Sequence, residues 1–234
     1  MNYAANFDSV ISAKESERAD FIRRTYTHLA MAVLAFIVIE YLLLQLPFAG
    51  AIARTMIGGY SWLIVLAVFM GVSWLAQRWA QSEISVQQQY LGLGLYVVAE
   101  AVIFLPLLYI AANFASADVI PIAGFITSFL FAGLTVTVFI TRKDFSWMRS
   151  ILTIGGFVAL GVIVASIIFG FSLGLIFSGI MILFASVAIL YDTSNVLHHY
   201  RTDQHVAASL SLFASVALLF WYILQFFMSL SSDD

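Results

Sequence analysis

Seven long apolar runs divide the sequence and constrain its fold more than any other feature. They occupy positions 25–46, 60–80, 90–112, 119–141, 149–169, 173–197 and 206–230. A helix needs about 20 apolar residues to cross the hydrocarbon core of a bilayer. Short polar or glycine-containing connections separate the runs, and no long Pro/Gly/Ser linker divides them. The pattern predicts an all-α polytopic membrane protein, a bundle of seven transmembrane helices that forms one domain over residues 1–234.

Composition agrees with this fold class and excludes several functions. The chain is 62% hydrophobic and only 10% charged, with a mean hydropathy of +1.00. The lipid bilayer is therefore the expected surrounding, and ten basic residues against a net charge of −3 make nucleic acid an unsuitable partner. The absence of cysteine excludes disulfides and thiolate metal sites. Neither a cofactor nor a metal site is expected.

The basic residues predict the orientation of the bundle, because Lys and Arg accumulate in short cytoplasmic loops. With seven spans, nine of the ten basic residues fall on one side, and only Arg54 falls on the other. The nine are Lys14, Arg18, Arg23, Arg24, Arg78, Arg142, Lys143, Arg149 and Arg201. We therefore expect a cytoplasmic amino terminus, with residues 1–24 as a polar tail, and a carboxyl terminus outside.

Small residues recur at four-residue spacing in two of the runs. Gly124, Ser128 and Ala132 form one stripe, and Gly161 with Ala165 forms another. In lipid, helices associate through close packing of such residues. Both stripes are therefore predicted to face neighbouring helices.

Three carboxylates, Glu40, Glu100 and Asp192, lie inside or at the edge of the spans. An acid at the centre of a membrane helix costs about 2.5 to 3.5 kcal/mol on insertion scales, so it normally faces protein or water. Glu40 and Glu100 have no Lys or Arg in their own spans, and such isolation favours the neutral, protonated form. A functional role and a hydrogen bond between helices remain equally open for both.

Asp192 has the most informative surroundings of the three acids. At helical spacing it shares a face with Ala185 on one side and with Asn195 on the other. If the last two spans form an antiparallel hairpin that turns near residues 203–204, Asp192 and Ser215 lie equally far from the turn. We expect Asp192 to lie inside the bundle near its cytoplasmic mouth, with Arg78 at a compatible depth as a partner. The alternative is an interfacial acid that simply ends a span.

Three other readings are disfavoured by the residues themselves. A retinal protein needs a lysine in the membrane, and Lys14 and Lys143 both lie outside the spans. Hydrolysis needs a base beside a nucleophile, and Ser178 has no histidine in the deep spans. A zinc site formed by the histidines at 198, 199 and 205 with Asp203 matches no strong spacing motif. No enzymatic activity is expected.

Two polar stretches resemble the Bax inhibitor-1 family, also called the transmembrane Bax-inhibitor-motif or Lifeguard-like family. They are TRKDFSWM at 141–148 and YDTSNVLHHY at 191–200, and the patterns at 23–36 and 208–224 agree with them. The style is that of bacterial members, which implies the bacterial inner membrane. The resemblance also implies a central last helix and, in some members, a pH-sensitive calcium leak closed by a pair of carboxylates. Asp192 matches the first of these acids, whereas Ser215 stands in place of the second.

Two functions of different class are consistent with these observations. The first is a pH-sensitive leak for cations such as calcium, or a related role in ion homeostasis. In this reading Asp192 and Ser215 form the gate, Arg78 is a candidate partner and Glu100 lines the path. The second is a non-transporting regulator of a membrane-bound protease or of a stress response. Ser215 favours the second reading, because one acid beside a hydroxyl does not titrate as a coupled pair.

Overall fold

The computed structural model describes residues 9–82 and 85–231, and in these ranges α-helices joined by short connections make up the fold. The helices are α1 (Glu15–Leu44), α2 (Ala49–Ile57), α3 (Ser61–Ala80), α4 (Val86–Phe114), α5 (Val119–Thr141), α6 (Met148–Phe169), α7 (Gly174–His198) and α8 (His205–Ser231). Seven of the helices in the described ranges are long and apolar enough to cross a membrane. The predicted seven-span architecture is confirmed.

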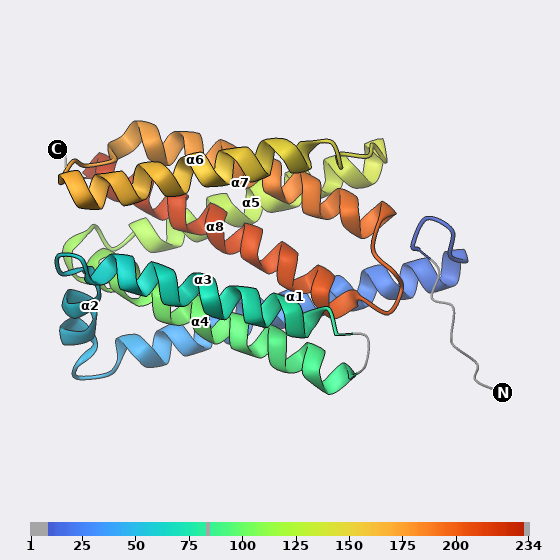
Figure 1. The fold of residues 1–234 in the computed structure, drawn as a ribbon, viewed down its shortest axis with the longest axis horizontal. Coiled ribbons are helices and arrows are strands. Elements are labelled where there is room, and N and C mark those ends of the chain that lie inside the picture. The colour runs from blue at the N-terminus through green and yellow to red at the C-terminus, as the bar shows by residue number, and fades with distance from the viewer. Residues whose placement is uncertain (1–8, 83–84, 232–234) are drawn as a thin grey trace.

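Helix α2 was not predicted, because its nine residues are too few for a span. It follows α1 at one end of the bundle, where it buries Ala49, Gly50 and Ala53 (Figure 1). A side chain at Gly50 would collide with the ring of Tyr109 in α4. The glycine therefore permits the short helix to lie directly against α4 and to close this end of the bundle.

Helix α1 begins at Glu15, so residues 15–24 of the predicted polar tail are helical and continue the first span towards the amino terminus. The segment consists largely of good helix formers. Asp20 accepts a hydrogen bond and ion pair from Arg23 at 2.6 Å and an ion pair from Arg24 at 2.7 Å, the i,i+3 and i,i+4 pairs that support a solvated helix. Ahead of α1, the Val10 amide donates to the Tyr200 carbonyl at 2.9 Å, which holds this segment against the α7–α8 loop. The part of the predicted tail at residues 1–8 lies outside the described residues.

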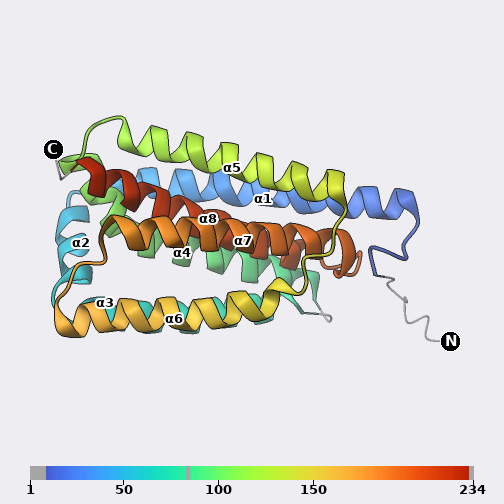
Figure 2. The same ribbon diagram turned by 90° about the horizontal axis from the view of Figure 1, so that it is seen from above.

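Helix α8 is the centre of the bundle. It runs between α6 and α7 on one side and α3 and α4 on the other (Figure 1), and it remains interior after a quarter turn (Figure 2). Its inward side chains, such as Phe213 and Leu219, are almost fully buried. Trp221 stacks on Trp62 at 6.1 Å between ring centroids and meets Phe104 edge-on at 4.9 Å. The position of the last span at the centre agrees with the implication of the family resemblance.

Helix α6 lies at the periphery and packs mainly on α7 (Figure 2). Among its residues only Ala159 is classed as buried. The prediction that both small-residue stripes face other helices is wrong: Gly124 and Gly161 have open space where a side chain would stand, and Ser128 and Ala132 are exposed. The loose edge of α6 leaves room for a cavity beside α8, as shown below.

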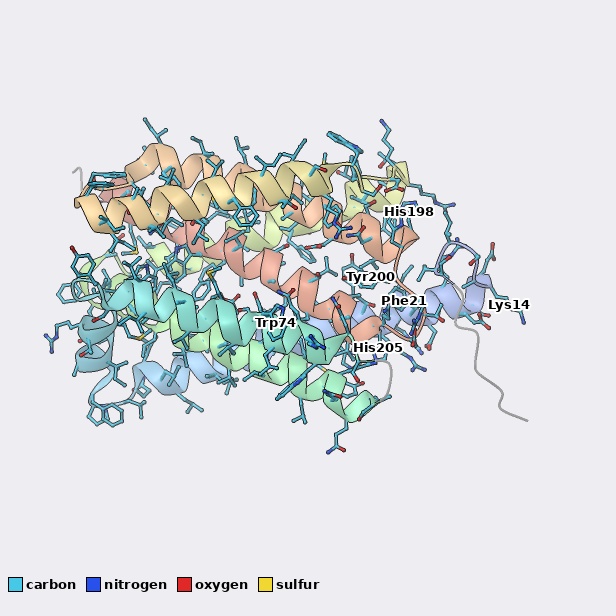
Figure 3. All side chains as sticks on the ribbon, viewed as in Figure 1. Lys14, Phe21, Trp74, His198, Tyr200 and His205 are labelled. Carbon is cyan, nitrogen blue, oxygen red and sulfur yellow. The ribbon has the colours of Figure 1, made fainter. Side chains whose placement is uncertain are left out.

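The nine basic residues named above lie at one end of the bundle, which is called the basic end here. It carries the start of α1, the end of α3, the α5–α6 connection and the α7–α8 loop. In Figure 3 this is the right-hand end, where Lys14 and His205 are labelled. Arg54 lies in α2 at the other end. The charge asymmetry predicted from the sequence is therefore present, whereas the orientation in a membrane stays a prediction.

Candidate ion site between helices α7 and α8

Asp192 belongs to the buried face of α7. The buried residues of this helix recur every three or four positions, through Met181, Ala185, Ile189, Asp192 and Val196. The face turns towards α8, the helix that α7 contacts most. Asp192 is only 8% exposed. The alternative of an interfacial acid that simply ends the span is wrong, because the helix continues to His198 and keeps the carboxyl group inside the bundle.

The Ser215 hydroxyl donates a hydrogen bond to Asp192 Oδ2 at 2.5 Å. The intervening loop is short and held by Arg201, which donates to Asp203 at 2.8 Å. The Gln204 side chain also accepts a hydrogen bond from the Arg201 amide. The hairpin therefore turns where the sequence predicted, and the predicted meeting of Asp192 and Ser215 is confirmed. Ser215 is itself 7% exposed, so the bond is shielded from solvent.

A cavity of about 490 Å³, called the inner cavity here, adjoins this bond on the Ser215 side. Its walls come from α3, α4, α6, α7 and α8, and most are apolar or aromatic, including Trp62, Phe104 and Trp221. Ser215, Glu100 and Tyr96 contribute its polar groups near α4 and α8. Glu100 is only 6% exposed, and most of the side chains that line the cavity with it are apolar. The cavity therefore provides the space beside an acid that is otherwise buried. The structure thus brings two of the predicted residues, Glu100 and Ser215, to one cavity.

A second, more polar cavity of about 600 Å³ lies at the basic end. Its lining includes Tyr191 and Asn195, which flank Asp192 on α7, together with Arg149 and His199. Ser215 lines the inner cavity, whereas neighbours of Asp192 line this basic-end cavity. The Asp192–Ser215 hydrogen bond therefore stands between residues that border the two cavities.

Arg78 is not part of this site, and the prediction that it pairs with Asp192 is wrong. Its side chain is exposed, and its guanidinium lies over the Trp74 ring at 5.5 Å from the centroid. Among the ion pairs of the described residues, none joins Arg78 to Asp192. Equal depth along two helices does not bring their side chains to the same face, and the outer face of α3 carries Arg78 away from α7.

Glu40 lies apart from both cavities, in α1. It is 4% exposed, and neither of its carboxyl oxygens has a hydrogen-bond partner within the described part of the chain. Of the two equally open readings for this residue, a hydrogen bond between helices is not found. Glu40 therefore differs from Asp192 both in its lack of a partner and in its distance from a cavity lining.

The contact that joins the two motifs was not predicted from the sequence. Asp144, in the α5–α6 connection, accepts hydrogen bonds from the Ser146 amide at 2.8 Å and from the His199 ring at 3.1 Å. The Phe145 amide donates to Ser194 Oγ at 2.9 Å. The Ser146 amide and, secondarily, His199 hold the pKa of Asp144 at about 2, below its usual range. Because 55 residues separate Asp144 from His199, their spacing along the chain gave no signal for this contact.

The three carboxyl-terminal histidines do not form a common site. His198 donates to the Ser194 carbonyl at 2.9 Å, and His199 meets Asp144. His205 lies instead beside Tyr90, with 3.4 Å between its Nε2 and the phenol oxygen. The zinc site weighed from their spacing is therefore not assembled.

Comparison with known proteins agrees with this fold and with the two motifs. An uncharacterized protein of Pseudomonas aeruginosa is 29% identical over 225 residues, which cover 95% of each chain. The protein of Escherichia coli named "Modulator of FtsH protease YccA" is 29% identical over 217 residues, 91% of each chain. "Bax inhibitor 1" of Schizosaccharomyces pombe is 30% identical over 183 residues, which are 75% of this chain and 65% of that protein.

The family assignment rests on the length of the match. Residues 18–232, which include all the helical spans except the first turn of α1, match the family described as "Inhibitor of apoptosis-promoting Bax1". Both motif stretches and the Asp192–Ser215 pair fall within these residues. The chain therefore belongs to the family of inhibitors of apoptosis-promoting Bax1, the Bax inhibitor-1 family that its motifs resemble.

Proposed function

We propose that the protein is a cation leak of a bacterial inner membrane, permeable to calcium, with the Asp192–Ser215 pair as its gate. The observation that carries this proposal is the buried carboxyl group of Asp192, bonded to one hydroxyl between residues that line two cavities. A carboxylate inside a membrane bundle is expensive and typically marks an ion or proton path. An E. coli relative named "Inner membrane protein YccA" supports the location.

The chemistry of the two cavities suits passage better than tight binding. Calcium takes six to eight oxygen ligands, and Asp192, Ser215 and Glu100 supply only a few of these. Water in the cavities has to supply the rest. Conduction needs sites that attract an ion and still release it, which a small number of spaced acids provides. Glu100 in the inner cavity is the second acid on the proposed path, and Glu40 is not on it.

A calcium-flux assay in liposomes tests this proposal. Purified protein should admit calcium faster than empty liposomes between pH 5 and 8. Asp192→Asn keeps the shape of the side chain and removes its charge, and it should lower the flux at least tenfold. Asp118→Asn is the matched control, because Asp118 is an exposed acid at the other end of the bundle. Flux equal to that of empty liposomes, or equal in wild type and Asp192→Asn, would overturn the proposal.

A second variant tests the gate itself. Ser215→Asp places a second carboxyl group within hydrogen-bonding distance of Asp192. Two close carboxyl groups cannot both ionise cheaply, so they titrate as a coupled pair. The pH profile of flux should therefore change from one proton-dependent step to two. An unchanged profile would show that residue 215 does not control the path.

The name of the E. coli relative, a modulator of FtsH protease, favours modulation of a membrane-bound protease as a second function. The amino-terminal segment is the suitable contact, because Val10 and Arg18 hold it against the end of the bundle near the motifs. Deletion of residues 1–13 removes this segment and leaves α1 intact. The full chain should co-purify with FtsH from E. coli membranes and the deletion variant should not. Equal recovery of FtsH with both proteins, or with neither, would contradict this second function.

A further inference from the structure

Two histidines converge on one phenol at the basic end, away from the Asp192–Ser215 pair. His28 Nε2 lies 3.0 Å from the Tyr90 hydroxyl, and His205 Nε2 lies 3.4 Å from the same oxygen. The two imidazole centroids are 5.0 Å apart. The residues come from α1, α4 and the start of α8, and His205 is labelled at this end in Figure 3. Sequence spacing could not reveal the group, because 62 residues separate His28 from Tyr90 and 115 separate Tyr90 from His205.

The tautomer of His28 is fixed by its second hydrogen bond. Its Nδ1 lies 2.7 Å from the Arg24 carbonyl oxygen, and a carbonyl oxygen only accepts. Nδ1 therefore carries the proton in the neutral ring, and the lone pair of Nε2 points towards Tyr90. Metal-binding histidines typically have this arrangement, in which the other ring N–H donates to a backbone carbonyl and orients the ligand nitrogen.

We propose that His28, Tyr90 and His205 bind a zinc ion through Nε2, Oη and Nε2. Ligand atoms about 2.0–2.1 Å from a tetrahedral zinc ion are about 3.3 Å apart. The separations from the Tyr90 oxygen to the two Nε2 atoms, 3.0 and 3.4 Å, are close to that edge length. Because Tyr90 is exposed and His28 is only half-buried, water has access to the fourth position. No three His, Cys, Asp or Glu side chains of the described residues form such a group, so the phenol is essential to this site.

The charged groups around the cluster are compatible with a cation. Besides His28 itself, the charged groups that act on His205 are Arg24, Asp20 and Asp203. Arg24 is already paired with Asp20 at 2.7 Å, and Asp203 is paired with Arg201. Zinc binding to the phenol releases its proton to solvent, and protons compete with zinc for both imidazoles. Binding should therefore weaken as the pH is lowered. A bound ion would tie α1 and α4 to the start of α8, the helix that carries Ser215.

Calorimetric titration of zinc chloride into tag-free protein in detergent tests the site. Wild type should bind one zinc ion per chain, and His28→Asn and His205→Asn should each weaken binding at least tenfold. Even partners that only orient a ligand change metal affinity about 10- to 100-fold. Tyr90→Phe keeps the ring and should also weaken binding. His198→Asn is the matched control, because that histidine bonds to Ser194 outside the cluster.

Cobalt gives an independent readout of the same site. Cobalt added to wild type should produce the visible absorption of a tetrahedral complex, and His28→Asn should not. His28 is half-buried and is not part of the hydrophobic core cluster, so this variant leaves the core intact. Failure of wild type to bind zinc would overturn the site, and so would equal zinc affinity in wild type and His28→Asn. Neither result depends on calcium flux, so the site and the proposed function fail separately.

Discussion

Asp192 and Glu40 are both buried acids of the bundle, and their surroundings differ in kind. Asp192 receives a hydrogen bond from Ser215, and its neighbours border two cavities. Both oxygens of Glu40 lack a hydrogen-bond partner within the described residues, and Glu40 lines neither of these cavities. Burial alone therefore does not distinguish the two acids. A partner that can be lost and a cavity that can hold water distinguish the region around Asp192.

The largest effect on stability is expected when Asp192 loses its hydrogen-bond partner and becomes unpartnered, as Glu40 is. Ser215→Ala removes the hydrogen bond to Asp192 and leaves the carboxyl group unpartnered. Leaving a buried polar group unsatisfied costs about 1–3 kcal/mol. Thermal unfolding in detergent should show this loss, whereas Ser186→Ala should show less, because Ser186 bonds only to a carbonyl of its own helix. Equal losses in the two variants would remove the distinction drawn here for Asp192.

The next effect concerns calcium flux and compares the same substitution at two buried acids. Glu100→Gln and Glu40→Gln are the same chemical change, and only Glu100 lines the inner cavity. Glu100→Gln should lower calcium flux severalfold, because it removes from the proposed path an acid that can ionise when a cation is near. Glu40→Gln should leave the flux unchanged. If Glu40→Gln reduced flux as much as Glu100→Gln, the comparison based on cavity lining would be wrong.

The smallest effect is expected at Asp144, an acid outside the spans. Its pKa is held at about 2, against an ordinary 3.8, chiefly by the Ser146 amide. A lowered pKa in the folded state stabilises the protein above the ordinary value, and the contribution disappears as the pH falls through about 2. Asp144→Asn should therefore lower thermal stability at neutral pH and converge with wild type in strong acid. Because the contact is half-exposed, the effect should stay below about 0.5 kcal/mol. A difference that stays undiminished well below pH 2 would contradict this cause.

The spans and the Asp192–Ser215 contact could be predicted because they depend on local features of the chain. Apolar length identifies a membrane helix. A short polar loop then fixes the register of the hairpin formed by α7 and α8, so positions equidistant from the turn meet. The first span was predicted to begin at residue 25, because the charged residues ahead of the apolar run were taken to lie outside the helix. In the structure α1 begins at Glu15. Polar residues with i,i+4 pairs continue a helix into water.

The sequence did not show which face of each helix contacts other helices and which face points outward. Lipid-facing and protein-facing surfaces are both apolar, so the stripe at Gly124 and Ser128 looked like a packing face and instead faces outward. Arg78 was likewise predicted at a depth compatible with Asp192, but the sequence did not show that its side chain lies on the outer face of α3. The contacts of His28 with Tyr90 and of Asp144 with His199 join distant parts of the chain. Spacing along one sequence carries no information about them.

The coupling between residues 192 and 215 in calcium flux tests the central claim most directly. The measurement compares Asp192→Asn, Ser215→Ala and the double variant in the same liposomes. If the two side chains act as one gate, the double variant should resemble Asp192→Asn, with a coupling of about 0.5–3 kcal/mol. Independent effects, in which the two fold-changes multiply, would contradict the account.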